Sequence, residues 1–198
     1  MKRINHDQRK QEIAEKAIRL FSQVGYDNVS LIMIAAAAGV SRTVLYRYFC
    51  SKREVLDAAI VFVTDSIEAK CTKIMASRAK NTEKLEGICH TVVDVMFKNK
   101  DFLVAVFDFV VGMARSGVSM GPSIGRFTTG TRTALRRLIE YAIDRHEIPE
   151  MLVVDRIADA LYAQFEACAL RIVIGTESNA KDAKVRFSDI IRAISIWK

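Results

Sequence analysis

Residues 30–53 read Ser-Leu-Ile-Met-Ile-Ala-Ala-Ala-Ala-Gly-Val-Ser-Arg-Thr-Val-Leu-Tyr-Arg-Tyr-Phe-Cys-Ser-Lys-Arg. Ser30 and Ser41 are favourable N-cap residues for two short helices. Gly39 lies between these helices, where a tight turn needs a residue that adopts positive φ without steric cost. The small residues around Gly39 allow the two helices to approach closely. This layout predicts a helix-turn-helix over about 30–49, in which the second helix enters the major groove of DNA.

The free face of the second predicted helix carries side chains suited to DNA: Arg42, Thr43, Tyr46 and Arg47. An Arg side chain can bridge O6 and N7 of guanine, and the Thr methyl group can contact the methyl group of thymine. Tyr hydroxyls and Lys more often bind phosphates, which fix the register without reading sequence. The alternative is an internal three-helix bundle whose basic face has no partner.

Apolar residues recur at spacings of three and four along almost the whole chain, which is typical of amphipathic helices. In the first predicted helix, about 8–24, the stripe comprises Ile13, Ala17, Leu20, Phe21 and Val24. Ser51 and Glu54 form a capping box at the start of the fourth helix, which runs to about residue 75. Further helices are predicted at about 82–98, 101–115, 124–146, 151–175 and 181–197. The sequence therefore predicts an all-α fold of about nine helices, with a loop over 115–125.

Positive charge is concentrated near the N-terminus. Residues 1–53 contain ten Lys and Arg against four Asp and Glu, a net charge of +6, whereas the whole 198-residue chain carries +7. A small basic unit on a nearly neutral body suggests a polyanion-binding head joined to a body with another task. The alternative is a basic face that only keeps the protein soluble.

The composition narrows the classes of function. We find no apolar run of about 18 residues and no signal-peptide pattern, so we expect a cytoplasmic protein without a membrane segment. Cys50, Cys71, Cys89 and Cys168 form no metal-binding spacing with the histidines, so we expect no metal and no cofactor. Nothing in the sequence has the pattern of a phosphate loop, a nucleophile elbow or a zinc-protease motif, so we expect no enzyme. A redox role for Cys50 stays open.

Several segments together resemble the TetR family of transcriptional regulators. They are the stretch from Leu20 to Tyr26, Val29-Ser30, Ile34-Ala35, the stretch from Ala38 to Ser41, that from Leu45 to Phe49, and that from Ser51 to Leu56. The resemblance covers about residues 8–60. It differs from the family pattern at Ile32 and Met33, where polar residues are usual, so the head either packs against something extra or exposes two hydrophobic side chains.

The resemblance implies a homodimer with a three-helix DNA-binding domain at 1–52 and a helical effector-binding and dimerisation domain at 53–198. It implies a repressor that binds a palindromic operator and is released by a small effector. It places Ser30, Tyr46, Tyr48 and Lys52 at phosphates, and Arg42, Thr43 and Arg47 near base edges or phosphates.

Two sets of side chains in the body are candidate sites. Large apolar and embedded polar residues predict a pocket for a hydrophobic or amphipathic effector. The candidates are His90, Asp94, Phe97, Phe107, Asp108, Val110, Met113, Tyr162, Phe165 and Glu166. Apolar seams in the last two helices predict a four-helix dimer interface. Its candidates are Leu161, Phe165, Cys168, Ile172, Phe187, Ile191 and Ile194.

Both sets have a simpler interpretation as ordinary intramolecular core. An adaptor that binds protein partners through its helices is the other class of function that the sequence leaves open. The operator sequence, the regulated genes, the identity of the effector and the choice between repressor and activator do not follow from the sequence.

Overall fold

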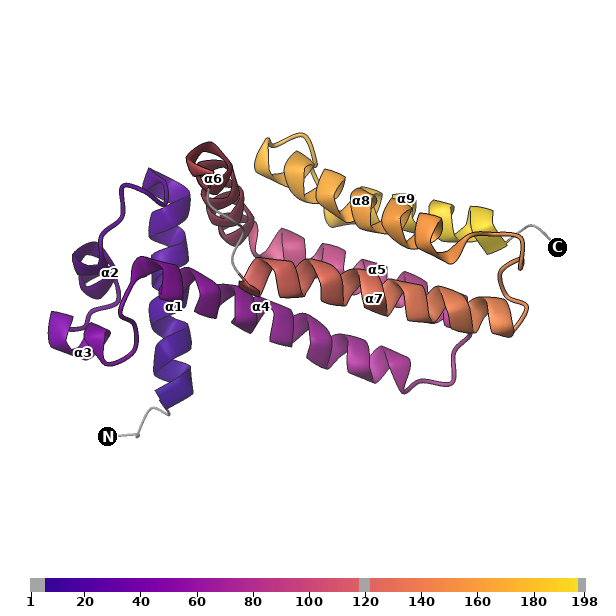
Figure 1. Cartoon of the computed structure of the whole chain (residues 1–198), viewed down its shortest axis with the longest axis horizontal. Helices are drawn as coiled ribbons and strands as arrows, with labels where there is room; N and C mark the ends of the chain where they lie inside the picture. The colour runs from indigo at the N-terminus through magenta and orange to yellow at the C-terminus, as the bar shows by residue number, and fades with distance from the viewer. Residues whose placement is uncertain (1–5, 118–121, 196–198) are drawn as a thin grey trace. The chain divides into compact units, whose positions relative to one another are not determined.

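The fold is all-helical in a computed structural model that describes residues 6–117 and 122–195. Within these ranges the chain forms nine α-helices and no strand, which confirms the predicted fold class. The helices are α1 (His6–Val24), α2 (Leu31–Ala37), α3 (Arg42–Tyr46), α4 (Lys52–Met75), α5 (Asn81–Lys98), α6 (Lys100–Ser116), α7 (Pro122–Asp144), α8 (Val154–Val173) and α9 (Ala180–Ser195) (Figure 1). In the described part of the chain, no helix is both long enough and apolar enough to cross a bilayer.

The predicted breaks fall close to the observed ones. The loop predicted over 115–125 contains the end of α6 at Ser116 and the start of α7 at Pro122, while residues 118–121 lie outside the described residues. The C-terminal end predicted for the last helix, residue 197, also lies outside them.

The helices divide into two compact units that do not follow the chain order. The first comprises Met1–Asp65 and Asn99–Ile124, and the second comprises Ser66–Lys98 and Gly125–Lys198. Helix α6 therefore belongs to the same unit as α1, α2 and α3, although α5 precedes it in the chain. The functional boundary after residue 52 stays a prediction, because a compact unit is defined by packing and not by task.

The core of the first unit is built on one face of α1. Ile13, Ala17 and Phe21 of the predicted stripe are buried, and Ile34 of α2 and Leu45 of α3 pack into the same cluster. The stripe ends earlier than predicted, because Val24 lies in the last turn of α1 and is 43% exposed. Helix α6 contributes Ala105 and Phe109 to this core.

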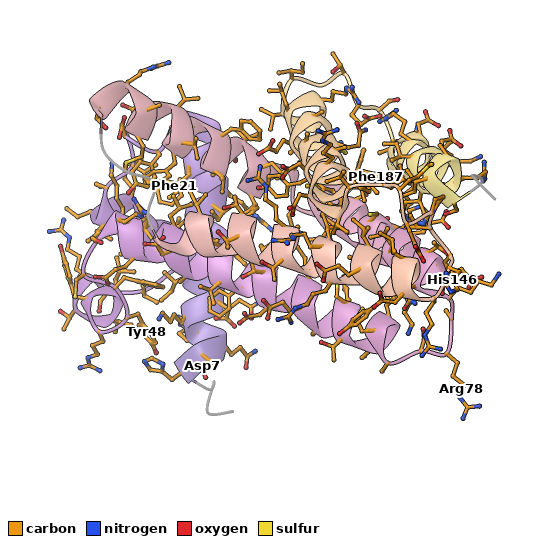
Figure 2. All side chains as sticks on the ribbon, turned by 45° about the vertical axis from the view of Figure 1, so that its right-hand side comes forward. Asp7, Phe21, Tyr48, Arg78, His146 and Phe187 are labelled. Carbon is orange, nitrogen blue, oxygen red and sulfur yellow. The ribbon has the colours of Figure 1, made fainter. Side chains whose placement is uncertain are left out.

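The core of the second unit lies where α5, α8 and α9 pack together. Phe165 of α8 and Phe187 of α9 have ring centroids 4.6 Å apart, and both side chains are buried. Cys89 of α5 is fully buried, as the apolar pattern around it predicts. Figure 2 labels Phe187 among the packed side chains of α9.

Side-chain caps fix the starts of α4 and α5. Both side chains of the predicted capping box act at α4: Ser51 Oγ accepts from Glu54 N at 3.1 Å, and the Glu54 carboxylate accepts from Cys50 N, one residue before the N-cap, at 2.8 Å. At α5 the cap comes from a distant residue, since the Glu147 carboxylate accepts from Thr82 N at 2.8 Å. Such bonds satisfy backbone N–H groups that a helix leaves unpaired at its start.

Two glycine-to-alanine substitutions test whether Gly39, in the turn after α2, is required for its positive φ or for lack of space. An added Cβ would meet nothing within 4 Å at Gly39 or at Gly130, but Gly39 has φ +64° and Gly130 lies within helix α7. We expect Gly39→Ala to lower the free energy of unfolding by about 1–2 kcal/mol, because a side chain disfavours positive φ. Gly130→Ala should raise it by about 0.5–1 kcal/mol. Denaturant titrations followed by circular dichroism measure both, and equal effects in the same direction would contradict this explanation.

Candidate nucleic-acid interface

The turn between α2 and α3 has the geometry that the sequence predicts. Gly39 adopts φ +64°, and Val40 N donates to the Ala35 carbonyl at 3.0 Å, which closes the C-terminal end of α2. Ser41 then begins α3, its hydroxyl accepting from Val44 N at 3.2 Å. The two short helices are thereby fixed against each other within a few residues, and they pack side by side next to α1 (Figure 1).

Helix α3 separates a buried face from an exposed one. Leu45 and the following Phe49 are almost completely buried and hold α3 against the core. The exposed side chains are those that the sequence assigns to DNA: Arg42, Thr43, Tyr46 and Arg47. Four side chains that can form hydrogen bonds, one of which also carries a methyl group, are therefore accessible at this short helix.

Two further predicted phosphate contacts have structural partners. Ser30 caps α2, with its Oγ accepting from Met33 N at 3.3 Å. Tyr48 is half-buried, and its ring centroid lies 4.7 Å from that of His6. Ser30 is exposed, so its hydroxyl hydrogen can still reach a phosphate, whereas Tyr48 is partly a packing residue.

Lys52 has an unexpected position. Its Nζ donates to the carbonyl of Tyr26 at 2.9 Å and to that of Asp27 at 3.0 Å, and it lies 4.5 Å from the centroid of the Tyr26 ring. An ammonium group has three N–H donors. At most one of them remains for a phosphate, so Lys52 has a structural role besides the one predicted for it.

Sequence analysis gives no sign of a contact between Tyr26 and Asp108. Asp108 is a predicted effector contact, but in the structure its Oδ2 accepts from Tyr26 N at 2.6 Å. These residues lie on α6 and in the turn after α1, 82 positions apart in the chain. No local pattern in the sequence links them.

Helix α2 exposes two hydrophobic side chains. Ile32 is 48% exposed and Met33 is 38% exposed. Of the two alternatives that the sequence leaves open, the single chain therefore shows the second: the head does not cover these side chains itself.

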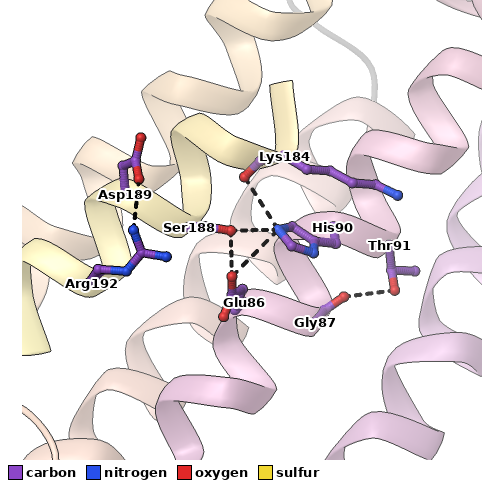
Figure 3. Close-up of polar contacts among 8 residues, drawn as sticks. All are labelled: Glu86, Gly87, His90, Thr91, Lys184, Ser188, Asp189 and Arg192. Atoms are coloured by element: carbon purple, nitrogen blue, oxygen red, sulfur yellow. Dashed lines mark hydrogen bonds and ion pairs between the residues drawn. The ribbon is translucent and has the colours of Figure 1, made fainter. Parts of the chain in front are cut away.

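Two predicted effector contacts in the second unit, His90 and Asp94, make polar contacts between α5 and α9, and Figure 3 shows those of His90. His90 Nε2 lies 3.0 Å from Ser188 Oγ and 3.3 Å from the Lys184 carbonyl oxygen. Ser188 donates to the carboxylate of Glu86, and the Lys184 ammonium lies 2.6 Å from an Asp94 carboxylate oxygen. His90 and Asp94 thus have partners within the protein, and an effector would compete with these.

The same network contains the residue types of a catalytic triad. Glu86, His90 and Ser188 are an acid, an imidazole and a hydroxyl in contact. In a catalytic triad the acid binds one ring nitrogen and the serine the other. Here Glu86 Oε1 and Ser188 Oγ both lie beside Nε2, at 3.8 and 3.0 Å, so this arrangement does not have the geometry of a triad. Among the described residues there is also no group of three potential metal ligands.

The other predicted pocket residues are divided between the two units. Phe107, Val110 and Met113 lie on α6 and are half-buried. In the second unit, Phe97 is half-buried and Glu166 is exposed. Their assembly into one pocket stays a prediction.

Tyr162 is buried beside an arginine. The guanidinium carbon of Arg132 on α7 lies 4.5 Å from the centroid of the Tyr162 ring on α8. Burial raises the pKa of the Tyr162 hydroxyl above its ordinary value, and the negative charge of Glu166 acts in the same direction. The phenol therefore stays neutral at physiological pH and offers a hydrogen-bond donor.

The seam predicted for dimerisation lies inside a single chain. Six of the seven candidate side chains are buried without any partner subunit, and Ile194 is half-buried. The six are Leu161, Phe165, Cys168, Ile172, Phe187 and Ile191. The periodicity correctly marks a buried face, but α5 and the pairing of α8 with α9 already cover it. The assignment of these side chains to a subunit interface stays a prediction.

The described helices thus form a helix-turn-helix whose second helix exposes two arginines. This geometry places the N-terminal region in the class of helix-turn-helix DNA-binding domains. Residues 13–59 match the family model described as bacterial regulatory proteins of the tetR family, which confirms the resemblance. This region of the chain is a tetR-family helix-turn-helix domain.

Relatives of known sequence match about half of the chain. The nucleoid occlusion factor SlmA of Haemophilus influenzae (strain PittGG) is 28% identical over 98 residues. That match covers 50% of this chain and 45% of the relative, so the chain spans less than half the length of this protein.

Solved structures share the fold of almost the whole chain. The fatty acid degradation regulator FadR from Bacillus halodurans has a TM-score of 0.77 at 15% identity, covering 94% of each chain. The ketosteroid transcriptional regulator KstR2 of Mycobacterium tuberculosis has a TM-score of 0.72 at 19% identity, covering 94% of this chain and 95% of that one. At these identities the likeness concerns the fold.

Thiol labelling tests the placement of the four cysteines. Cys50 is exposed beside α3, whereas Cys89 and Cys168 are buried, and burial raises the pKa of both thiols. Since the thiolate is the reactive form, a disulfide reagent should modify Cys50 rapidly, and Cys89 and Cys168 only upon unfolding. Burial also raises the pKa of the half-buried Cys71, which should react slowly.

The matched control for this labelling is Cys50→Ser, which should remove the fast phase and leave the slow phases unchanged. A fast phase that persists in Cys50→Ser would contradict the placement.

Proposed function

We propose that the chain is a cytoplasmic, dimeric transcriptional regulator that binds a palindromic DNA operator through residues 30–49. In this proposal it acts as a repressor and is released by a small hydrophobic or amphipathic effector. The observation that supports DNA binding is the exposed face of α3. Buried Leu45 and Phe49 hold this helix against the core. Its exposed side chains are Arg42, Thr43, Tyr46 and Arg47. Repression is taken from the family resemblance.

Specific and non-specific contacts have different roles on this surface. Arg42, Thr43 and Arg47 would read base edges in the major groove. Ser30, Tyr46, Tyr48 and the remaining N–H of Lys52 would bind phosphates and fix the register. The concentration of positive charge in residues 1–53 supports such binding, because DNA phosphates attract a basic surface regardless of sequence.

A dimer would use the outward faces of α8 and α9. Small or apolar side chains are exposed there in the single chain, including Ala160, Ala163 and Leu170 on α8 and Val185 on α9. Pairing of these helices with those of a second copy gives a four-helix bundle with two-fold symmetry. Such a dimer presents two recognition helices to half-sites about one helical turn, or a multiple of it, apart.

An effector would act by favouring a dimer conformation whose heads do not fit the operator. One structural neighbour is named as a fatty acid degradation regulator, and another as a ketosteroid transcriptional regulator. These names are consistent with an apolar or amphipathic effector. A preference of about 3 kcal/mol for the non-binding conformation would weaken operator binding on the order of a hundredfold.

Selection from random duplex DNA tests the recognition surface. At about 0.15 M salt, where non-specific binding is weak, the wild-type protein should enrich a palindrome. Arg47→Ala should weaken binding to that palindrome by about 1–3 kcal/mol and relax the preference at one base position in each half-site. Arg137→Ala is the matched control, because it removes the same charge from an exposed position on α7.

Each outcome of the selection is informative. Enrichment of no sequence by the folded wild-type protein would contradict DNA recognition and favour the adaptor alternative. An unchanged consensus and affinity with Arg47→Ala would contradict the role of Arg47.

The dimer surface is tested by a charge placed at its centre. We expect Leu170→Glu to weaken dimerisation by at least about tenfold, since two carboxylates would be buried without partners at the two-fold interface. Leu170 is 46% exposed in the single chain, so the subunit should still fold. Sedimentation velocity measures the effect, with Met151→Glu, at a position 80% exposed, as control. A dimer that is insensitive to Leu170→Glu would place the interface elsewhere.

A further inference from the structure

Both polar groups of the Tyr26 backbone are held by side chains from other helices. The N–H donates to Asp108 Oδ2 on α6 at 2.6 Å, and the carbonyl accepts from Lys52 Nζ on α4 at 2.9 Å. Each bond involves a charged partner, which makes it stronger than a bond between neutral groups. The turn that follows α1 is therefore fixed from two directions.

The side chain of Tyr26 is enclosed as tightly as its backbone. Its ring centroid lies 5.1 Å from that of Phe21 on α1 and 4.8 Å from that of Phe109 on α6, the latter in an edge-on arrangement. The Lys52 ammonium lies 4.5 Å from its centroid. Burial raises the pKa of the Tyr26 hydroxyl, so the ring remains neutral in this position.

The backbone conformation of Gly25 brings the Tyr26 amide to α6. Gly25, which follows α1, has φ +83°, and a Cβ built on it would lie in ordinary van der Waals contact with Asp108 Oδ2, at 3.5 Å, so conformation and not space favours Gly here. Arg53 adds a contact between α4 and α6, since its guanidinium carbon lies 4.4 Å from the Phe109 ring centroid. Within α4, its Nε lies 3.0 Å from a carboxylate oxygen of Asp57. Helices α4 and α6 thus hold one turn of the head together.

The Tyr26 turn leads directly into the DNA-binding surface. Val29 N donates to the Tyr26 carbonyl at 3.3 Å, and the Val29 side chain is buried. The next residue, Ser30, caps α2, and α2 packs on α3. A shift of Tyr26 would therefore displace Ser30 and α2, which support the recognition helix.

We propose that Asp108 is a positioning residue for DNA binding: it acts from α6 by fixing the Tyr26 turn and does not contact DNA. The proposal rests on the proposed function. It assigns the Asp108 carboxylate to the support of the DNA-binding head and not to an effector pocket. The acceptor oxygen carries the effect, so an amide in place of the carboxylate should retain most of it.

The test compares Asp108→Ala with Asp108→Asn, using the duplex that the wild-type protein selects. We expect Asp108→Ala to weaken binding on the order of tenfold, because Tyr26 N loses a charged partner. Asp108→Asn should stay within about threefold of wild type, because its side-chain oxygen can accept the same bond. The slope of log K against log salt should be unchanged in both variants, since no phosphate contact is lost.

The control is Asp65→Ala, which removes the same charge from an exposed position on α4. Equal affinity of Asp108→Ala and wild type would overturn the proposal. So would equal losses in the Ala and Asn variants, or a smaller salt slope in either. Wild-type protein that binds no duplex would instead refute the proposed function, and the two failures are therefore distinguishable. If Asp108→Ala does not fold, the Asn variant alone still overturns the proposal by a tenfold loss.

Discussion

The DNA-binding head depends on the backbone of Tyr26, whose N–H donates to Asp108 and whose carbonyl accepts from Lys52. A three-helix head of this size has a small core, and small cores provide little stability by themselves. Helix α6 enlarges that core with Ala105 and Phe109 and adds a directional hydrogen bond that apolar packing cannot supply. The core of the head thus includes side chains of α6 and of the start of α4 besides those of α1 to α3.

The second unit is held by a different kind of contact. Phe165 and Phe187 join α8 to α9, and the network around His90 joins α9 to α5. Glu147 reaches from beyond α7 to cap the start of α5, so the ends of two helices far apart in the chain are fixed by one carboxylate. These contacts bury the most apolar faces of α8 and α9 within one chain.

Local features were predictable from the sequence, and long-range pairing was not. Ser30, Ser41 and the Ser51–Glu54 pair act within four residues, so their capping bonds follow from sequence alone. The stripe through Leu161 and Phe165 predicts that a face is buried but not what covers it, and within one chain both side chains are already buried. The bond between Asp108 and Tyr26 joins residues 82 positions apart, and no periodicity encodes such a pair. The exposed face of α3 was predictable because buried and exposed positions alternate within one short helix.

Hydrogen exchange at the Tyr26 amide, followed by NMR in the DNA-free protein, tests the central claim most directly. The account predicts that this amide exchanges far more slowly than that of Asn28, an exposed residue of the same turn, because its proton is bound by the Asp108 carboxylate. Exchange of both amides at similar, rapid rates would show that α6 does not hold the turn. It would contradict the dependence of the head on Asp108.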